Sequence, residues 1–396
     1  MDYRLGRANV AKPFDQVARL RWSFRLTQRR WIGRILVAIM TASLVPATAG
    51  CGSLLESTPS ESPDSRVVRS QAAVDQFVGR ADAPGCSAAV AERGVVVWQG
   101  SRGLADLDSH AAITSATSFS IGSVSKQFIA IGVLLLEQAG QLSTSDRLSE
   151  YVPGMPAWAD RVTLAQLIHH ASGIPEYIGA LGPKGWPEAT LTKQDALAKI
   201  FAAKKLRFPP GTKWEYSNSN YLLLGVIIER VSGQSLGTFL REQIFDPLQL
   251  HMVASPGQEI PGRARSYTQP GSAFENVEGH IYALGPGGIW STSADLVKWA
   301  DNYRTGSVGG PALLTRVLDG SQDTGIESSP YPGARYGAGI FILPDNRLVH
   351  GGNFQGFQSS FIVSPDRQSA AAVLCNRFES TPDILTEVLA SVWEFR

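Results

Sequence analysis

Short apolar runs bounded by turn residues occur towards both ends of the chain, and they predict β-strands there. The first two runs, Cys86–Ala91 and Val95–Gly100, are joined by Glu92-Arg93-Gly94, a sequence typical of a hairpin turn. Four more strands are predicted near the other end, over Tyr336–Leu343, Arg347–His350, Phe357–Val363 and Ser369–Asn376.

Apolar residues recur at helical spacing through the middle of the chain and at its two flanks. Ser125–Ala139 is the most apolar of these segments, which predicts a buried helix. The other predicted helices cover Ser65–Ala81, Thr163–His170, Lys193–Ala203, Ser219–Val231, Leu236–Ile244, Ser293–Tyr303 and Asp383–Glu394. Strands at both ends around a helical insert predict an α/β (α+β) domain over residues 71–396, with the mainly helical region at roughly 124–300.

The first fifty residues have the pattern of an export signal. Residues 1–34 carry nine basic and two acidic side chains, and the uncharged run Ile35–Val45 follows before small residues lead to Cys51. Eleven residues are too few for a helix that spans a bilayer, although a short membrane anchor is the alternative interpretation. We therefore predict an export signal over residues 1–50, with the Sec and twin-arginine routes both open.

Cys51 resembles the acylated cysteine of bacterial lipoproteins, because Ala49 and Gly50 precede it, whereas Thr48 stands where that pattern prefers leucine. Residues 51–70 are mostly polar and are interrupted by prolines, which predicts a flexible tether. Lipidation of Cys51 would attach the domain to a membrane, in the periplasm or cell envelope and facing the extracytoplasmic side.

Charge and composition narrow the range of functions. Without the nine basic and two acidic residues of the first 34, the totals of 36 basic and 35 acidic residues become 27 and 33, a net charge of −6. A body of that charge has no electrostatic reason to bind nucleic acid. With 43% hydrophobic residues a sizeable core can form, and three cysteines without Cys-x-x-Cys spacing argue against a disulfide scaffold and against that type of zinc site.

Ser123-Val124-Ser125-Lys126 places a serine and a lysine one turn apart at the start of the predicted buried helix. A serine hydroxyl becomes a good nucleophile when a base removes its proton, and a buried lysine with a lowered pKa can be that base. The helix amino terminus adds free N–H groups near the serine oxygen. The alternative is an exposed serine beside a surface lysine.

Two further motifs carry candidate chemistry. Tyr216-Ser217-Asn218 precedes a predicted helix; its tyrosine could relay protons and its asparagine could hold a substrate amide, although a helix cap beside a core tyrosine is the simpler interpretation of this motif alone. His350-Gly351-Gly352 follows a predicted strand, and its glycines allow a ligand to approach the backbone. There the histidine could orient a substrate carboxylate and the amide of Asn353 could face an oxyanion, unless the segment is only a turn with a surface histidine.

Taken in this order, the three motifs resemble those of the serine β-lactamase and penicillin-binding protein superfamily. The resemblance covers roughly Pro84 to Asn376. It is strongest to the branch that holds class C β-lactamases, D-Ala-D-Ala carboxypeptidases, D-aminopeptidases and related esterases. The stretches that carry it are Phe119–Phe128, Leu167–Pro175, Pro209–Asn218, Gly287–Thr292 and His350–Gly356.

The resemblance implies an antiparallel sheet built from both chain ends and flanked by helices. It implies Ser123 as the acylated nucleophile, Lys126 as its proton acceptor, and Tyr216 as general acid and base. The amides of Ser123 and Asn353 would form the oxyanion hole, and no cofactor or metal is implied. The residues that it assigns to substrate binding are Asn218, which would hold the substrate amide, His350, Gly352 and Asn353.

By the same resemblance, the chain is expected to be a periplasm-facing serine hydrolase that acts through an acyl-enzyme on small esters, amides or D-amino-acid peptides. Class C-like β-lactamase or D-Ala-D-Ala carboxypeptidase activity is one alternative. A sensor that penicillins or muropeptides acylate without turnover is another. His350-Gly351-Gly352 departs from the Lys-Thr-Gly of true class C enzymes, and this departure weighs against hydrolysis of β-lactams.

The strand order of the family also places Cys86 and Cys375, in the first and last predicted strands of the sheet, side by side. Bridges between adjacent strands must meet narrow geometric limits. We therefore expect two neighbouring buried thiols rather than a disulfide.

Three other motifs imitate functional sites. Gly233–Gly237 fits the Gly-x-Ser-x-Gly elbow of α/β-hydrolase esterases, but the preceding run is helical, so Ser235 is expected to cap the next helix. Arg304-Thr305-Gly306 imitates Lys-Thr-Gly but lies where a helix is predicted to end. His169 and His170 are adjacent, so their side chains point apart on a helix, and no third ligand stands nearby in a recognised metal-site pattern.

Overall fold

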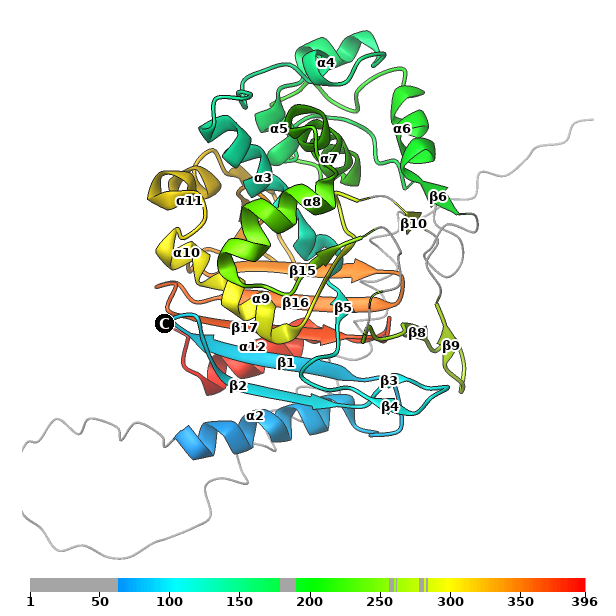
Figure 1. Cartoon of the computed structure of the whole chain (residues 1–396), viewed down its shortest axis with the longest axis vertical. Helices are drawn as coiled ribbons and strands as arrows, with labels where there is room; N and C mark the ends of the chain where they lie inside the picture. The colour runs from blue at the N-terminus through cyan, green and yellow to red at the C-terminus, as the bar shows by residue number, and fades with distance from the viewer. Residues whose placement is uncertain are drawn as a thin grey trace, which may run out of the picture. The chain divides into compact units, whose positions relative to one another are not determined.

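The computed structural model describes residues 63–178, 190–255, 260, 262–277, 281–282 and 284–395 (Figure 1). These residues belong to one unit, Glu61–Arg396. The predicted export signal over residues 1–50 and the predicted lipidation site Cys51 lie outside the described residues. The predicted tether over residues 51–70 overlaps the first described helix, so its boundary at residue 70 lies too far along the chain.

That helix, α2, spans Pro63–Val78, and contacts with the end of the chain hold it in place. Ser70 is fully buried and accepts a hydrogen bond from Trp393 Nε1 at 2.9 Å. Arg66 lies over the Trp393 ring, 4.5 Å from its centroid. Residues 63–70 are mostly polar, as in a tether, yet they form a helix whose side chains pack on the end of the chain.

Eight strands form one sheet in the order β12-β13-β14-β15-β16-β17-β1-β2, and all neighbours in it are antiparallel. The strands are β1 (Cys86–Glu92), β2 (Val95–Arg102), β12 (Gln322–Asp323), β13 (Arg335–Tyr336), β14 (Phe341–Ile342), β15 (Leu348–Phe354), β16 (Phe357–Val363) and β17 (Ser369–Cys375). β1 pairs with β17, so strands from the two ends of the domain are neighbours. The predicted fold class, an α/β domain whose antiparallel sheet is built from both ends, is confirmed.

Most helices lie in the sequence between β2 and β12, as predicted. They are the 3-10 turn η1 (Gly122–Ser125), α3 (Lys126–Gln138), α4 (Leu148–Tyr151), η2 (Ala157–Arg161), α5 (Leu164–Ile168), α6 (Lys193–Phe201), α7 (Asn218–Ser232), α8 (Leu236–Leu240), the π-turn η3 (Arg241–Phe245), η4 (Asp246–Leu248), α9 (Ser293–Ala300), α10 (Asn302–Thr305) and α11 (Gly310–Leu318). Short strands occur there too: β3 (Leu104–Asp106), β4 (Ala111–Ala112), β5 (Phe119–Ser120), β6 (Leu191–Thr192), β7 (Val253–Ala254), β8 (Tyr267–Thr268), β9 (Glu275–Asn276), β10 (Ile281–Tyr282) and β11 (Ile289–Ser291). α12, Pro382–Val392, follows the last strand.

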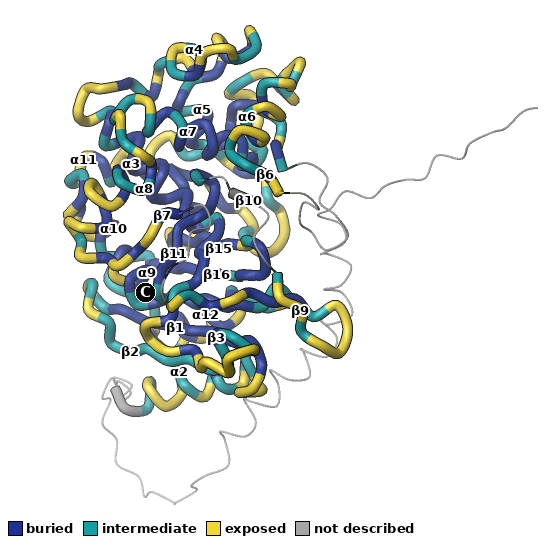
Figure 2. The backbone as a smooth tube through the Cα atoms, turned by 45° about the vertical axis from the view of Figure 1, so that its right-hand side comes forward, coloured by how far each residue is buried: buried dark blue, intermediate teal, exposed yellow. Residues whose placement is uncertain are grey.

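Helices cover both faces of the sheet, and alternate residues of a strand enter two different clusters. Ala88 and Val90 of β1 join the cluster that includes residues of α2 and α12, whereas Ala89 and Ala91 join the larger cluster with α9 and the helical region. Figure 2 accordingly shows the central strands buried and the helices with exposed outer faces. Burial on both faces explains why β1 and β17 are mostly apolar rather than alternating between apolar and polar residues.

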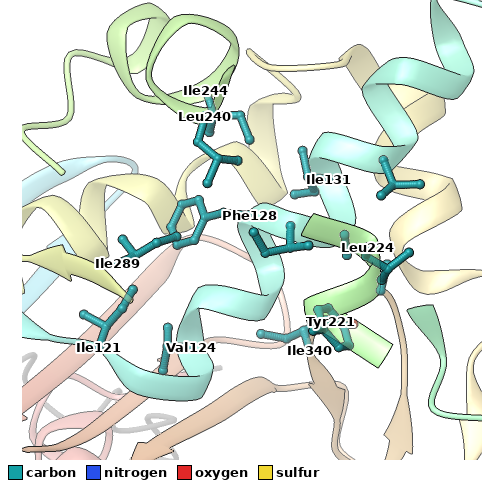
Figure 3. Close-up of a cluster of buried hydrophobic side chains, with 14 of the residues drawn as sticks. Ile121, Val124, Phe128, Ile131, Tyr221, Leu224, Leu240, Ile244, Ile289 and Ile340 are labelled. Atoms are coloured by element: carbon teal, nitrogen blue, oxygen red, sulfur yellow. The ribbon is translucent and has the colours of Figure 1, made fainter. Parts of the chain in front are cut away.

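α3 lies at the centre of the larger cluster (Figure 3). The Phe128 ring has its centroid 4.6 Å from that of Trp299 and 5.5 Å from that of Phe245. Ile131, one turn further along, lies among side chains of α7 and α8 in Figure 3. The predicted buried helix is therefore confirmed, with η1 leading into it.

A tight turn divides the strand predicted over Tyr336–Leu343 into β13 and β14. Gly339, with a φ of 79°, lies so close to α3 that a Cβ on it would be 2.6 Å from Lys126 O. Glycine permits this approach because it has no side chain. The turn thereby packs against the first residues of α3.

Cys86 and Cys375 form a disulfide, which corrects the expectation of two free thiols. They are directly paired residues of β1 and β17, with Cα atoms 4.1 Å apart. Residues that face each other directly in an antiparallel pair present their side chains on the same face. The sequence indicated only that the two strands are neighbours. Whether a bridge can form depends on the exact register, which here pairs Cys86 directly with Cys375.

Candidate active site

Ser123 is held at the start of α3 by a network of backbone contacts. The preceding strand β5 pairs with β11, and Ile121 N donates to Ile289 O at 3.0 Å. Ser359 of β16 donates from Oγ to Ile121 O at 2.8 Å. Ser123 is half-buried while Val124 beside it is fully buried, so its hydroxyl lies at a surface with a rigid backbone behind it.

Lys126 is fully buried and lies next to Ser123. Its Nζ is 2.9 Å from three oxygens: Ser123 Oγ, Asn218 Oδ1 and the carbonyl of Pro286. The Tyr216 and Tyr221 rings also face the ammonium, with centroids 4.8 and 5.5 Å from Nζ. The predicted one-turn spacing therefore brings the two side chains into hydrogen-bond contact.

Burial lowers the pKa of Lys126 to about 7, against a smaller opposing effect of the Glu176 carboxylate. A lysine ammonium can donate to all three oxygens at once, but a neutral amine has two donors and one lone pair. Asn218 Oδ1 and Pro286 O can only accept, so the lone pair of the neutral amine is left for the Ser123 hydroxyl. The geometry therefore suits proton transfer from Ser123 to Lys126.

Tyr216 lies in the segment that leads into α7, and its ring is next to Lys126. Its side chain is half-buried, and burial raises the pKa of its phenol, while the nearby Ser123 acts in the opposite direction. The phenol is therefore protonated at neutral pH and lies beside the serine. The tyrosine of the Tyr-x-Asn motif thus belongs to the same cluster as Ser123 and Lys126.

Asn218, the first residue of α7, connects Lys126 to a carboxylate that the sequence analysis missed. Glu176 Oε2 accepts hydrogen bonds from Asn218 N at 2.7 Å and from Asn218 Nδ2 at 3.1 Å. An acceptor at the first N–H of a helix satisfies a donor that has no partner within the helix. Glu176 directly follows the stretch Leu167–Pro175, but no spacing rule links it to the three motifs.

The Gly352–Asn353 segment of β15 lies directly against the serine turn. A Cβ on Gly352 would be 2.1 Å from Ile121 O, and one on Gly122 would be 2.9 Å from Asn353 N. Both positions therefore require glycine. The close approach brings the Asn353 amide to the turn that carries Ser123, where the oxyanion hole was expected.

His350 lies beneath the site and is only 2% exposed. Its Nδ1 donates to Gly351 O at 2.6 Å, and its Nε2 is 3.4 Å from the Tyr336 hydroxyl. Burial, together with the charge of Lys126, lowers the pKa of His350 to about 3, so the ring is neutral. The ring is packed against Tyr336 and Phe341, and a direct contact of His350 with a substrate carboxylate is not supported.

The motifs that imitate functional sites have structural roles. Ser235 caps α8 by accepting from Thr238 N at 3.2 Å, as expected, and α7 ends immediately before it at the left-handed Gly233. Arg304 pairs with Asp301, and Gly306 ends α10 in a left-handed conformation. Neither motif contacts Ser123 or Lys126 in the described part of the chain.

His169 and His170 diverge, as expected of adjacent residues. His169 lines a cavity of about 390 Å³ together with Gln166, Arg316 and Gln322. Residues of the three catalytic motifs do not line this cavity. His170 is buried against Tyr216, with ring centroids 4.4 Å apart. Within the described ranges, no three His, Cys, Asp or Glu side chains gather as a metal site, and no helix has the length and apolarity to cross a membrane.

Comparison with known proteins gives one consistent result. The model of the Beta-lactamase family matches residues 71–390. Penicillin-binding protein 4* of Bacillus subtilis (strain 168) is 33% identical over 315 residues, which are 74% of this chain and 68% of that protein. Protein flp of Staphylococcus aureus (strain MW2) is 26% identical, and the match covers 74% of this chain and 59% of that protein.

Solved structures share the fold at lower identity. The octameric penicillin-binding protein homologue from Pyrococcus abyssi matches with a TM-score of 0.73 and 23% identity, over 83% of this chain and 77% of that one. The D-amino acid amidase from Ochrobactrum anthropi SV3, in complex with D-phenylalanine, gives a TM-score of 0.70 and 23% identity, over 84% and 98%.

Proposed function

The chain belongs to the Beta-lactamase family and is a serine hydrolase, and from this premise we propose that it cleaves small esters, amides and D-amino-acid peptides through an acyl-enzyme on Ser123. The observation that carries the proposal is the contact between Ser123 Oγ and a fully buried lysine whose pKa is about 7. A base of that pKa is half neutral near pH 7, the condition for general-base catalysis at physiological pH.

In acylation, neutral Lys126 takes the proton of Ser123 as the serine oxygen attacks the substrate carbonyl. The amides of Ser123 and Asn353 stabilise the negative charge that develops on the carbonyl oxygen. Tyr216 passes a proton to the leaving amine or alcohol, and Asn218 holds the amide of the acyl group. In deacylation, Tyr216 and Lys126 act in the reverse direction on a water molecule, which releases the acid and restores Ser123.

The charges around the site favour neutral or cationic substrates over anionic ones. Glu176 is an exposed carboxylate beside Asn218, and the neutral His350 supplies no positive charge on the opposite strand. The Glu176 carboxylate therefore disfavours an anionic substrate relative to an ester or to an amide with a free ammonium group. This reasoning favours esterase and D-amino-acid amidase or peptidase activity over β-lactamase and carboxypeptidase activity.

Similarity to penicillin-binding protein 4* supports a second candidate, a protein that penicillins acylate without turnover. Labelling with a fluorescent penicillin and with a fluorophosphonate distinguishes the two. The modified serine is identified by peptide mass, and its recovery is followed over time beside hydrolysis of a p-nitrophenyl ester and a D-amino-acid amide. Turnover with recovery supports the hydrolase, and a stable adduct without ester or amide turnover supports the sensor.

Ser123→Ala should reduce hydrolysis by about 10³-fold or more in a folded protein, because the acyl-enzyme cannot form. Ser235→Ala is the matched control, since Ser235 also precedes a helix but caps it, and this variant should keep most of the activity. Equal losses in the two folded variants, or label on Ser235, would refute the assignment.

The proposal extends to location: the chain is exported and is attached to the extracytoplasmic side of a membrane through Cys51. The pattern of residues 1–51 supports it, and so does the Cys86–Cys375 bridge, because structural disulfides persist mainly in oxidising compartments. Cell fractionation tests it. The wild type should be found with membranes, and Cys51→Ala should be soluble outside the cytoplasm; a wild type in the cytosol contradicts the proposal.

A further inference from the structure

His170 contacts three successive residues around Tyr216. Its backbone oxygen accepts from Glu215 N at 2.9 Å, and its ring Nδ1 accepts from Ser217 N at 3.2 Å. Between these bonds, the imidazole lies against the Tyr216 ring at a tilt of 36°, with centroids 4.4 Å apart. His170 thus holds the residues before and after Tyr216 by hydrogen bonds, and its ring packs against the Tyr216 ring.

His170 has an uncommon backbone conformation. Its φ of 56° is in the left-handed region, which only about a few per cent of residues other than glycine adopt, asparagine, aspartate and histidine most often. Its ring is fully buried, and Tyr336 packs against it with a centroid distance of 4.7 Å. A strained, buried residue of this kind persists because its surroundings hold it.

The hydrogen bonds also define the state of the imidazole. Asn220 Nδ2 lies 3.1 Å from Nδ1, and Ser172 Oγ donates to Asn220 Oδ1 at 2.7 Å, which turns the NH₂ group towards the histidine. Nδ1 therefore accepts hydrogen bonds and carries no proton. Burial, with the positive charge of Lys126, keeps the pKa of His170 well below its ordinary value and so maintains the neutral ring.

We propose that His170 is a positioning residue for Tyr216: it fixes the orientation of the phenol beside Ser123 and Lys126 and does not touch the substrate. The inference rests on the proton-transfer role proposed for Tyr216. Such transfers require heavy-atom distances of about 2.6–3.2 Å, and a displacement of about 1 Å can cost about 10²-fold in rate.

Two substitutions of His170 remove its two contacts one at a time: the packing of its ring on Tyr216 and the hydrogen bond that it accepts from Ser217 N. His170→Phe keeps an aromatic ring on Tyr216 but removes the acceptor for Ser217 N. His170→Asn keeps a side-chain acceptor and tolerates the left-handed backbone, but removes the ring. His169→Phe is the matched control, because the neighbouring ring lines the cavity and lies outside the described cluster around Tyr216. For a p-nitrophenyl ester, each His170 variant should lower kcat about 10- to 100-fold with KM within about threefold, and the control should change neither.

A double-mutant cycle with Tyr216→Phe gives the decisive result. Because His170 acts through Tyr216, His170→Phe should cause less than about a threefold further loss in the Tyr216→Phe background. If His170→Phe fails to fold by circular dichroism, His170→Asn takes its place in the same cycle. Equal losses in both backgrounds, an effect on KM alone, or an equal loss in His169→Phe would overturn the inference. If Tyr216→Phe itself keeps full activity, it is the proposed role of Tyr216 that fails.

Discussion

Glu176 is connected to Lys126 through a single amide, that of Asn218. The Asn218 oxygen accepts from Lys126 Nζ at 2.9 Å, while its nitrogen donates to Glu176 Oε2 at 3.1 Å. A surface carboxylate is thereby coupled to a fully buried amine, and its negative charge favours the protonated form of that amine. The acid–base behaviour of the site therefore depends on a residue outside its three sequence motifs.

Replacement of Glu176 by glutamine should lower the pKa of Lys126 below its present value of about 7, because the charge that stabilises the ammonium is lost. The acid limb of kcat/KM for an uncharged ester should move to lower pH, by about half a unit to one unit. Glu150→Gln is the control, since Glu150 is an exposed carboxylate that accepts from a backbone N–H at the start of another helix, α4. An acid limb that does not move, or moves to higher pH, would contradict this coupling.

Lys126 should make the free energy of unfolding depend on pH. Its pKa is lowered in the folded state, so between about pH 7 and pH 10 the unfolded chain binds more protons and the folded protein gains stability as pH rises. Relative to Lys126→Met, the wild type should gain on the order of a few kcal/mol over this range, as measured by urea unfolding. The exposed Lys205→Met should show no such trend, and a difference that falls with pH would refute the buried-amine assignment.

His350 should not titrate in the physiological range, because burial lowers its pKa to about 3. Both reactions depend on the ionisation of Lys126 in the same way. The ratio of kcat/KM for a chromogenic cephalosporin to that for a p-nitrophenyl ester is therefore independent of this ionisation. We expect this ratio to favour the ester and to be flat from pH 5 to 9. A step near pH 6.5 would show that His350 is charged in the site, and a ratio that favours the cephalosporin would identify a β-lactamase.

The Cys86–Cys375 bridge should account for part of the stability of the sheet. Replacing both cysteines by alanine should lower the free energy of unfolding by about 2–5 kcal/mol, because the bridge constrains the unfolded chain. Non-reducing intact mass with an alkylating agent gives an independent check. Cys86 and Cys375 should resist alkylation in denaturant until a reductant is added; ready alkylation would mean that the thiols are free.

The sequence predicts the nucleophile and its base because their relationship is local. Ser123 and Lys126 are three residues apart on one helical turn, and the apolar run after them indicates burial, so both the contact and its chemical consequence follow from the pattern. The eight-stranded sheet is predicted in its main strands for a similar reason. The central strands β1 and β17 are mostly apolar runs, because helices cover both faces of the sheet.

Features that depend on the exact meeting of distant segments escape prediction. Glu176 enters the site because the segment after α5 lies against the start of α7, and the disulfide depends on a one-residue register between β1 and β17. The burial of His350 depends on Tyr336 and Phe341 from neighbouring strands. The sequence analysis does not predict α11. Pro311 lies in the first turn of this helix, where the N–H that proline lacks would have no partner within the helix.

The pairing of β1 with β17 also sets the order in which the domain can be completed. Cys86 and Cys375 are 289 residues apart, so at about 5–20 residues per second a ribosome needs about 15 to 60 s to supply the partner of β1. During that interval the β1–β2 hairpin has an apolar, unpaired edge, which is a template for aggregation. The nascent chain must therefore keep this edge protected until its last strand has emerged.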